Sequence, residues 1–211
     1  TASAGSGELK QCKAIDSLSS CSEHTSKAFE FLGFEARIVE RPDQAAAASH
    51  LVLPGDAAFG GAMHNLCRGG WEEAIHRSID QGKPFLGICV GLQLLYTGSD
   101  ESPGVEGLDV LEGRVCALSD AVKRPQMQWN RLDHVVGHPL FSGIDEEAWV
   151  YFVHGYAAPV GPATVATCEY GSTVCAAVAS GNLWATQFHP EKSQEIGLRI
   201  LGNFARFVKK G

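Results

Sequence analysis

The sequence predicts an α/β domain with a mixed, mainly parallel central sheet, flanking helices and added antiparallel hairpins. In the first half of the 211 residues, short apolar runs alternate with helix-like segments, an order typical of a parallel sheet covered on both faces. From about residue 105, strand-like runs follow one another closely and are separated by Gly, Asn and Asp, which is typical of antiparallel hairpins. A last segment with helical periodicity closes the chain.

Glycine and proline divide the first half into elements. The run SKAFEFLGF predicts a helix with Ala28, Phe31 and Leu32 on one face and Gly33 as its stop signal. The runs EARIVE, SHLVLPG and FLGI predict strands, and WEEAIHRSIDQGKP predicts a helix that ends at its Gly-Lys-Pro signal. In such a sheet, functional groups are expected at the carboxyl ends of the strands.

The second half reads as short strands and one helix. Strands are expected within GLDVLEGRVCAL, QMQWNRLD, AWVYFVHGYAAP, TVATCEYG and VCAAVASGNLWATQFHP. The last helix should run from Ser193 to about Lys209 and stack Ile196, Ile200 and Phe204. The length favours one domain over residues 1–211, with residues 1–12 as a disordered or artificially added start.

Composition excludes several classes of partner. The formal charge of −7 and the pI near 5.6 argue against binding to nucleic acid or to an anionic membrane surface. Seven cysteines form no C-x-x-C pair, so a disulfide scaffold or a zinc knuckle is disfavoured and reduced thiols in a cytoplasm are expected. The sequence has no apolar stretch near the roughly 20 residues of a membrane span and no secretion signal at its start.

A cysteine lies between two glycines at the predicted turn from strand to helix. The run LGICVGLQLL places Cys89 between Gly87 and Gly91, the pattern of a nucleophile elbow that exposes a reactive side chain on a tight turn. A helix that begins after Cys89 would favour the thiolate, and the Val90 N–H could bind an oxyanion. A buried cysteine packed at a strand end fits the same pattern, and this corner alone leaves both interpretations open.

A second motif supplies the groups that a thiolate nucleophile needs. The run ATQFHPEKS places His189 and Glu191 at the end of another predicted strand, and Pro190 stiffens the turn between them. A base and a group that orients the base complete a catalytic triad. A metal site is disfavoured, because no second ligand lies at suitable spacing beside His189.

Together, PFLGICVGLQLLY and WATQFHPEKS resemble the class I glutamine amidotransferases, which release ammonia from glutamine through a Cys-His-Glu triad. Within that class, GVEGLDVLEGRV, MQWN, VYFVHGYAAP and QFHPEKSQEIGLRILGNF resemble the glutaminase subunit of imidazole glycerol phosphate synthase, from histidine biosynthesis. The similarity covers roughly residues 27 to 208. It implies a flavodoxin-like sheet, glutamine as substrate and no cofactor.

The resemblance also implies roles for the triad. Cys89 would attack the side-chain amide of glutamine, His189 would pass the proton to the departing ammonia, and Glu191 would hold the imidazole. The oxyanion hole would correspond to backbone at Val90, Gly55 and Ala57.

Glutamine-binding residues follow from the same resemblance. Gln93 and Glu101 match positions that contact bound glutamine, with Glu101 at its ammonium group. Backbone contacts to the carboxylate would come from His154, Gly155 and Tyr156. Other interpretations stay open, since Gln93 could be a solvated helix residue, Glu101 a loop charge and Tyr156 a packed strand residue.

By resemblance, the ammonia passes to a separate (β/α)₈-barrel cyclase subunit, so a heterodimer is expected. Met127, Trp129 and Asn130 match the segment that faces this partner. An edge strand with one packed tryptophan is the alternative interpretation of these residues.

Three segments depart from the family pattern. Asp16 to His24 read DSLSSCSEH where members usually carry D-Y-G-x-G-N-L-x-S. Asp56 and Ala57 replace the last two residues of P-G-V-G, and Gln128 replaces the glycine of M-G-W-N. An amidotransferase-like subunit that hydrolyses glutamine poorly is therefore an alternative function. A glutaminase of another pathway, or a related thiol hydrolase, is a third one, against which the M-x-W-N and V-Y-F-V-H runs speak.

Overall fold

The computed structural model describes residues 11–15, 20–135, 137–145 and 147–208. Residues 1–10 of the expected added start lie outside this part of the chain, as do residues 16–19 of the N-terminal departure from the family.

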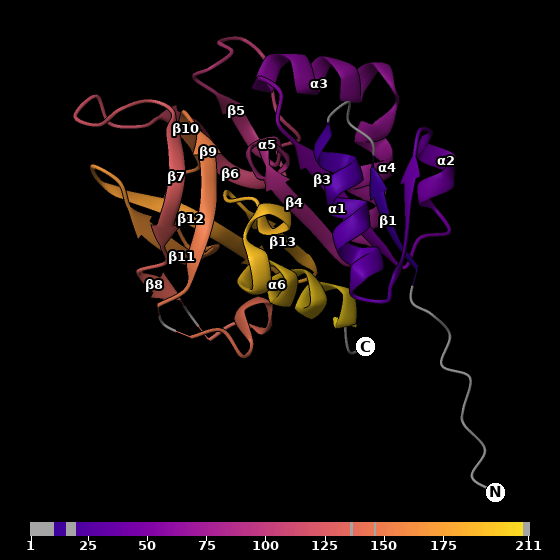
Figure 1. Ribbon diagram of the computed structural model, residues 1–211. Helices are drawn as coiled ribbons and strands as arrows, with labels where there is room; N and C mark the ends of the chain where they lie inside the picture. Colours follow the sequence, from indigo (N-terminus) through magenta and orange to yellow (C-terminus); the bar gives the residue numbers. More distant parts are fainter. Residues whose placement is uncertain (1–10, 16–19, 136, 146, 209–211) are drawn as a thin grey trace, which may run out of the picture.

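A mixed sheet of eight strands forms the centre of the described chain (Figure 1). Its first five strands run parallel in the spatial order β2 (Glu35–Val39), β1 (Gln11–Ile15), β3 (His50–Gly55), β4 (Phe85–Cys89) and β13 (Leu183–Thr186). Its antiparallel continuation is β12 (Thr173–Ser180), β11 (Thr164–Glu169) and β8 (His134–Val135). The predicted mixed, mainly parallel sheet is thus confirmed.

Two small sheets extend this core. One joins β5 (Tyr96–Ser99), β6 (Leu111–Ala117) and β10 (Tyr156–Ala157), and the other pairs β7 (Gln126–Arg131) with β9 (Trp149–His154) in antiparallel register. The added antiparallel strands of the prediction are therefore present, although β5 and β6 are parallel.

Helices pack on the central sheet. They are α1 (Ser20–Phe31), α2 (Pro42–Ala45), α3 (Phe59–Arg68), α4 (Trp71–Asp80), α5 (Val90–Gln93) and α6 (Gln194–Arg206), with 3₁₀ turns η1 (Pro139–Phe141) and η2 (Pro190–Lys192). Figure 1 shows α1 beside α6, where the rings of Phe29 and Phe204 lie 6.4 Å apart. Among the described helices, none is long and apolar enough to cross a membrane.

The buried face of α1 differs from the predicted one. Phe31 is 78% exposed, and the buried aromatic residue of this helix is Phe29. Ser22, Thr25 and Ser26 line the same buried face as Phe29. Ala28 and Leu32 of the predicted face are partly buried and pack against the core, so the prediction was wrong for Phe31 and did not include the small hydroxylated residues.

The register of the parallel strands brings distant segments to one edge. Gly55 at the end of β3 is paired with Cys89 at the end of β4, and Ile88 is paired with Thr186 at the end of β13. The loop after β3, the cysteine corner and the segment after β13 therefore meet at the carboxyl edge of the sheet, where a site was expected.

Candidate active site

Cys89 occupies a strained corner between β4 and α5. Its φ of 54° and ψ of −107° lie outside the regions that side-chain-bearing residues favour, and the residue is only 3% exposed. A Cβ atom on Gly91 would lie 1.8 Å from the carbonyl oxygen of Leu53, and one on Gly87 would lie 2.7 Å from the carbonyl oxygen of Gly91. Both glycines are thus required by close backbone contacts, as expected for an elbow.

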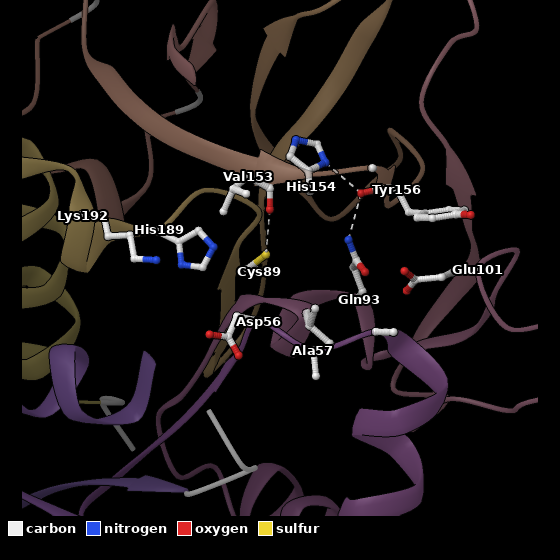
Figure 2. A pocket seen from close by; sticks show the side chains of 13 residues that line it. Asp56, Ala57, Cys89, Gln93, Glu101, Val153, His154, Tyr156, His189 and Lys192 are labelled. Carbon is white, nitrogen blue, oxygen red and sulfur yellow. Dashed lines mark hydrogen bonds between the residues drawn. The ribbon is translucent and has the colours of Figure 1, made fainter. Parts of the chain in front are cut away.

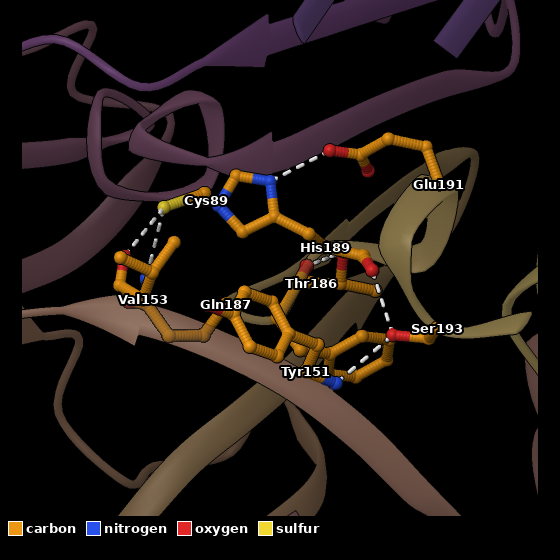
Figure 3. A network of polar contacts seen from close by, with 9 residues as sticks. Cys89, Tyr151, Val153, Thr186, Gln187, His189, Glu191 and Ser193 are labelled. Carbon is orange, nitrogen blue, oxygen red and sulfur yellow. Dashed lines mark hydrogen bonds and ion pairs between the residues drawn. The ribbon is translucent and has the colours of Figure 1, made fainter. Parts of the chain in front are cut away.

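His189 and Glu191 form a buried pair beside this corner. His189 Nδ1 lies 2.7 Å from Glu191 Oε1, and both side chains are fully buried. A carboxylate can only accept a hydrogen bond here, so Nδ1 carries the proton and donates it. Figure 3 shows the imidazole between the carboxylate and Cys89, with its Nε2 edge turned toward the sulfur. This order of groups is the one that thiol activation needs.

The backbone of His189 is anchored to β9. Its N–H donates to the carbonyl oxygen of Tyr151 over 2.9 Å. The hydroxyl of Ser193 donates to the carbonyl oxygen of His189 over 2.7 Å and accepts from the Tyr151 N–H over 3.0 Å. Figure 3 shows this closed set of bonds. Sequence reasoning missed Ser193 and Tyr151, because no spacing rule links β9 to the turn after β13.

The sulfur of Cys89 contacts one donor and one acceptor. The Nε2 of Gln187 donates to Sγ over 3.7 Å, and the thiol donates to the carbonyl oxygen of Val153 over 3.7 Å. Gln187 also went unrecognised in the sequence, although it stands two residues before His189.

A cavity of about 330 Å³ opens above the sulfur. This volume lies at the lower end of the range of small-molecule sites. Two of the residues predicted for catalysis, the oxyanion hole and glutamine binding do not line the cavity: Glu191 lies behind His189, and Gly55 pairs with Cys89 in the sheet. Its lining, most of which Figure 2 labels, consists of Asp56, Ala57, Ala58, Cys89, Val90, Gln93, Glu101, Val153, His154, Gly155, Tyr156, His189 and Lys192.

Gln93 is a buried wall of this cavity and not a solvated helix residue. It is 3% exposed, and its Nε2 donates to the carbonyl oxygen of Tyr156 over 2.8 Å and to Gln187 Oε1 over 3.1 Å. The same carbonyl of Tyr156 lies 2.8 Å from Nδ1 of His154. Burial lowers the pKa of His154 to about 4, so its imidazole is neutral near pH 7.

Glu101 combines a structural contact with its position in the cavity. Its Oε2 accepts the N–H of Phe59, the first residue of α3, over 2.8 Å. A carboxylate at a helix N-terminus satisfies an unpaired N–H and meets the positive end of the helix dipole. Glu101 is therefore more than a loop charge, and a glutamine-binding role for it stays a prediction.

The loop after β3 has a relaxed backbone. Among the described residues, the non-glycine positions with positive φ are Cys89, Asp109 and Gln194, so Ala57 does not have a left-handed conformation. Figure 2 shows Asp56 and Ala57 on the side of the cavity opposite Val153. Lys192, which sequence reasoning did not select, lines the cavity near His189.

The β7–β9 sheet presents an apolar face. Met127, Trp129 and Trp149 are 61%, 38% and 53% exposed. Trp129 is paired with Tyr151 across the two strands, and their rings meet edge to face at 6.0 Å, so the tryptophan is both packed and exposed. Asn130 donates from Nδ2 to the carbonyl oxygen of Glu169 over 3.0 Å. Trp149 is an exposed aromatic residue that the sequence motif did not include.

Within the described residues, no group of three or more His, Cys, Asp or Glu side chains could hold a metal ion. The residues at this site supply a nucleophile, a base and an orienting carboxylate from their side chains, and N–H donors from the backbone. These are the groups that acyl transfer requires.

Comparison with known proteins covers nearly the whole chain. A family model described as glutamine amidotransferase class-I matches residues 13–206. The imidazole glycerol phosphate synthase subunit HisH of Syntrophotalea carbinolica is 47% identical over 187 residues, which cover 84% of this chain and 91% of that protein. The subunit of the same name from Synechococcus sp. (strain JA-3-3Ab) is 48% identical over 192 residues, with coverage of 87% and 88%.

Solved structures share the fold at lower identity. A chain of PurLQS from Thermotoga maritima aligns with a TM-score of 0.74 at 19% identity and covers 93% of this chain and 97% of its own length. The glutaminase domain of CTPS from Trypanosoma brucei aligns with a TM-score of 0.60 at 15% identity, with coverage of 95% and 96%.

Proposed function

The chain belongs to the class-I glutamine amidotransferase family, and on this premise we propose that it is the glutaminase subunit of imidazole glycerol phosphate synthase, in a single amidotransferase domain. The relatives of 47% and 48% identity, which align over most of their length, are named imidazole glycerol phosphate synthase subunit HisH. The observation that carries the proposal is the pair of Cys89 and His189 at one cavity, with Glu191 bonded to His189 from behind.

The proposed reaction converts glutamine to glutamate and ammonia. The thiol of Cys89 gives its proton to His189 Nε2, and Sγ bonds to the amide carbon of the substrate. When the C–N bond breaks, the imidazolium protonates the departing nitrogen, and a thioester remains on Cys89. His189 then takes a proton from water, which attacks the thioester and releases glutamate. Glu191 keeps the imidazole oriented and stabilises its charged form.

Backbone donors would stabilise the oxyanion in both steps. Val90 lines the cavity directly after the nucleophile, and we assign its N–H to the oxyanion hole together with backbone at Gly55 and Ala57. A Cβ atom on Gly55 would lie 3.0 Å from that of Val90, so the two segments approach closely.

We assign the far end of the cavity to the backbone of glutamine. Gln93 and Glu101 would bind the ammonium end, and the segment His154, Gly155 and Tyr156 would face the carboxylate. The cavity also holds Asp56 near the reacting end, which favours a weakened glutaminase as a second candidate function.

The exposed face of β7 and β9 would bind the cyclase subunit that consumes the ammonia. Met127 and Trp129 are apolar and exposed there, and Trp149 extends the same face. Exposed tryptophans of this kind are frequent anchors of protein interfaces. The cytoplasm remains the expected location of the complex.

Glutamate release from glutamine, measured with and without the cyclase subunit and its bound ligand, tests this proposal. We expect low activity for the chain alone and strong stimulation by the partner, because binding of the partner with its ligand would close or reshape the loop after β3. Trp129→Ala should weaken stimulation, whereas Phe31→Ala removes a more exposed aromatic ring from α1, away from this face, and should not. A complex without glutamate release would favour the weakened form, and equal rates without a complex would favour another pathway.

A further inference from the structure

Gln187 connects the nucleophile to the wall of the cavity. Its side chain is fully buried, and its backbone N–H donates to the carbonyl oxygen of Ala176 over 2.8 Å, which fixes its place after β13. Its amide spans two partners, since Nε2 donates to Cys89 Sγ over 3.7 Å and Oε1 accepts from Gln93 Nε2 over 3.1 Å. Figure 3 shows Gln187 and Val153 on the same side of the sulfur.

The orientation of this amide follows from its neighbours. The carbonyl oxygen of Tyr156 can only accept, so the atom of Gln93 that lies 2.8 Å from it is the NH₂ group. The same NH₂ group meets Gln187, which must therefore present its oxygen to Gln93. The nitrogen of Gln187 then faces the sulfur of Cys89. The carbonyl oxygen of Tyr156 thus fixes the orientation of the Gln187 amide through Gln93.

The two contacts of the sulfur act in opposite directions. The carbonyl oxygen of Val153 accepts a proton and therefore stabilises the neutral thiol. Once His189 has taken that proton, the same carbonyl faces a negative sulfur. An N–H donor stabilises the anion and opposes this repulsion, and a buried site makes the interaction stronger than it would be in water.

We propose that Gln187 is a positioning residue whose amide N–H stabilises the thiolate that forms when Cys89 gives up its proton, and that Gln93 and the Tyr156 carbonyl keep this amide in the donating orientation. The inference deepens the proposed glutaminase function and rests on the same nucleophile. It also predicts that Gln93 influences the sulfur before any substrate binds.

Several ionisable groups surround the sulfur besides Gln187. His189 reaches it from the segment after β13, backed by Glu191. The cavity above it is lined by the ionisable side chains of Asp56, Glu101, His154 and Lys192. A substitution at Gln187 leaves all of them in the chain, so a change in sulfur reactivity can be assigned to the lost donor.

The test is the pH profile of iodoacetamide alkylation at Cys89, which lines the cavity. Mass spectrometry of its peptide separates this signal from that of Cys67 and Cys116, which are exposed free thiols. Gln187→Met keeps the length of the side chain and removes the donor. We expect the midpoint of the profile to move up by about one pH unit, with an approximately tenfold lower rate near pH 7 and an unchanged alkaline plateau. Gln187→Glu should move the midpoint further, because a carboxylate adds negative charge. Gln93→Met should move it less.

Thr186→Val is the matched control. Its hydroxyl donates to the carbonyl oxygen of Phe188 over 3.0 Å, so the variant loses a buried hydrogen bond in the same segment without touching the sulfur. We expect a lower melting temperature and an unchanged alkylation profile. Unshifted profiles for both Gln187 variants would overturn the proposal. Alkylation requires neither glutamine nor a partner, so a shifted profile supports Gln187 even where the glutaminase assay fails, and the two inferences can fail separately.

Discussion

The two sides of the cavity constrain the sulfur to different degrees. On the side of β4 and β13, the side chains of Cys89, Gln187 and His189 are buried, and each has hydrogen-bonded partners. On the side of the loop after β3, Asp56 and Ala57 are exposed, and the backbone has no left-handed residue at position 57. One side is fixed by hydrogen bonds within the protein, whereas the other is an exposed loop to which we assign part of the oxyanion hole.

The difference shows where substitution is tolerated. A side chain on Gly87 or Gly91 would collide with backbone, so the corner has one sterically allowed sequence pattern. The exposed loop has no such restriction, and it carries Asp56 and Ala57 without disturbing the sheet. The chemistry of the loop can thus differ from that of relatives while the triad geometry stays intact.

The largest expected effect comes from breaking the constrained side. Cys89→Ser should lower partner-stimulated glutamate release by at least about 10³-fold, because a serine hydroxyl is a far weaker nucleophile near neutral pH. Labelling by an electrophilic glutamine analogue should be lost as well, with an unchanged circular dichroism spectrum. Cys116→Ser, at an exposed thiol, should retain both signals. Substantial residual hydrolysis in Cys89→Ser would remove this residue from its proposed role.

On the constrained side, the sequence predicted those features of the site that depend on residues close together in the chain. The glycines around Cys89 and the His-Pro-Glu turn each act within five residues, so their spacing carries the information. Contacts between distant segments left no such trace. Gln187 meets a cysteine 98 positions away, and the carboxylate of Glu101 meets the start of α3 42 positions away.

Burial decided the remaining differences. Three small hydroxylated residues join Phe29 on the buried face of α1, and hydrophobicity did not reveal their part in it. Trp149 is exposed because one face of β9 points outward. Pairing with β7 sets which face this is, and the sequence of β9 alone does not. The fold class followed from the order of elements, which is a property of the sequence alone.

A medium effect on stability comes from His154, which belongs to the buried network of the constrained side. Burial lowers the pKa of its imidazole from 6.5 to about 4, so between these values the unfolded chain binds a proton that the folded chain does not. The free energy of unfolding should therefore fall by up to about 3 kcal/mol from this residue as the pH drops from 6.5 to 4.

Urea unfolding of His154→Gln and the parent chain across this pH window measures the effect. The variant should be less stable at pH 7, because it loses the contact to Tyr156, and its stability should depend less on pH. His64→Gln, at an exposed position on α3, is the control for removing a histidine. Equal pH dependence of parent and His154→Gln would show that the imidazole is protonated in the folded protein.

The smallest expected effect sharpens the comparison from the loop side. We expect the peptide after Asp56 to rotate when its N–H binds the oxyanion, and a left-handed conformation costs a residue with a side chain on the order of 1 kcal/mol more than glycine. Ala57 carries this cost, and Asp56 adds a carboxylate close to the developing negative charge. A missing oxyanion donor typically lowers rates by about 10²- to 10³-fold, so a partial defect of this kind is measurable.

Asp56→Val combined with Ala57→Gly should raise kcat of the partner-bound enzyme by at least about tenfold, roughly 1.4 kcal/mol, with little change in KM. The two single variants separate the causes: Ala57→Gly reports the backbone cost, and Asp56→Val reports the charge. Because the carboxylate is screened at high salt, the gain from Asp56→Val should shrink with ionic strength and the gain from Ala57→Gly should not. An unchanged or lower kcat in the double variant would mean that the oxyanion is bound without rotation of this loop. The N–H of Val90, on the constrained side of the cavity, would then be the main oxyanion donor.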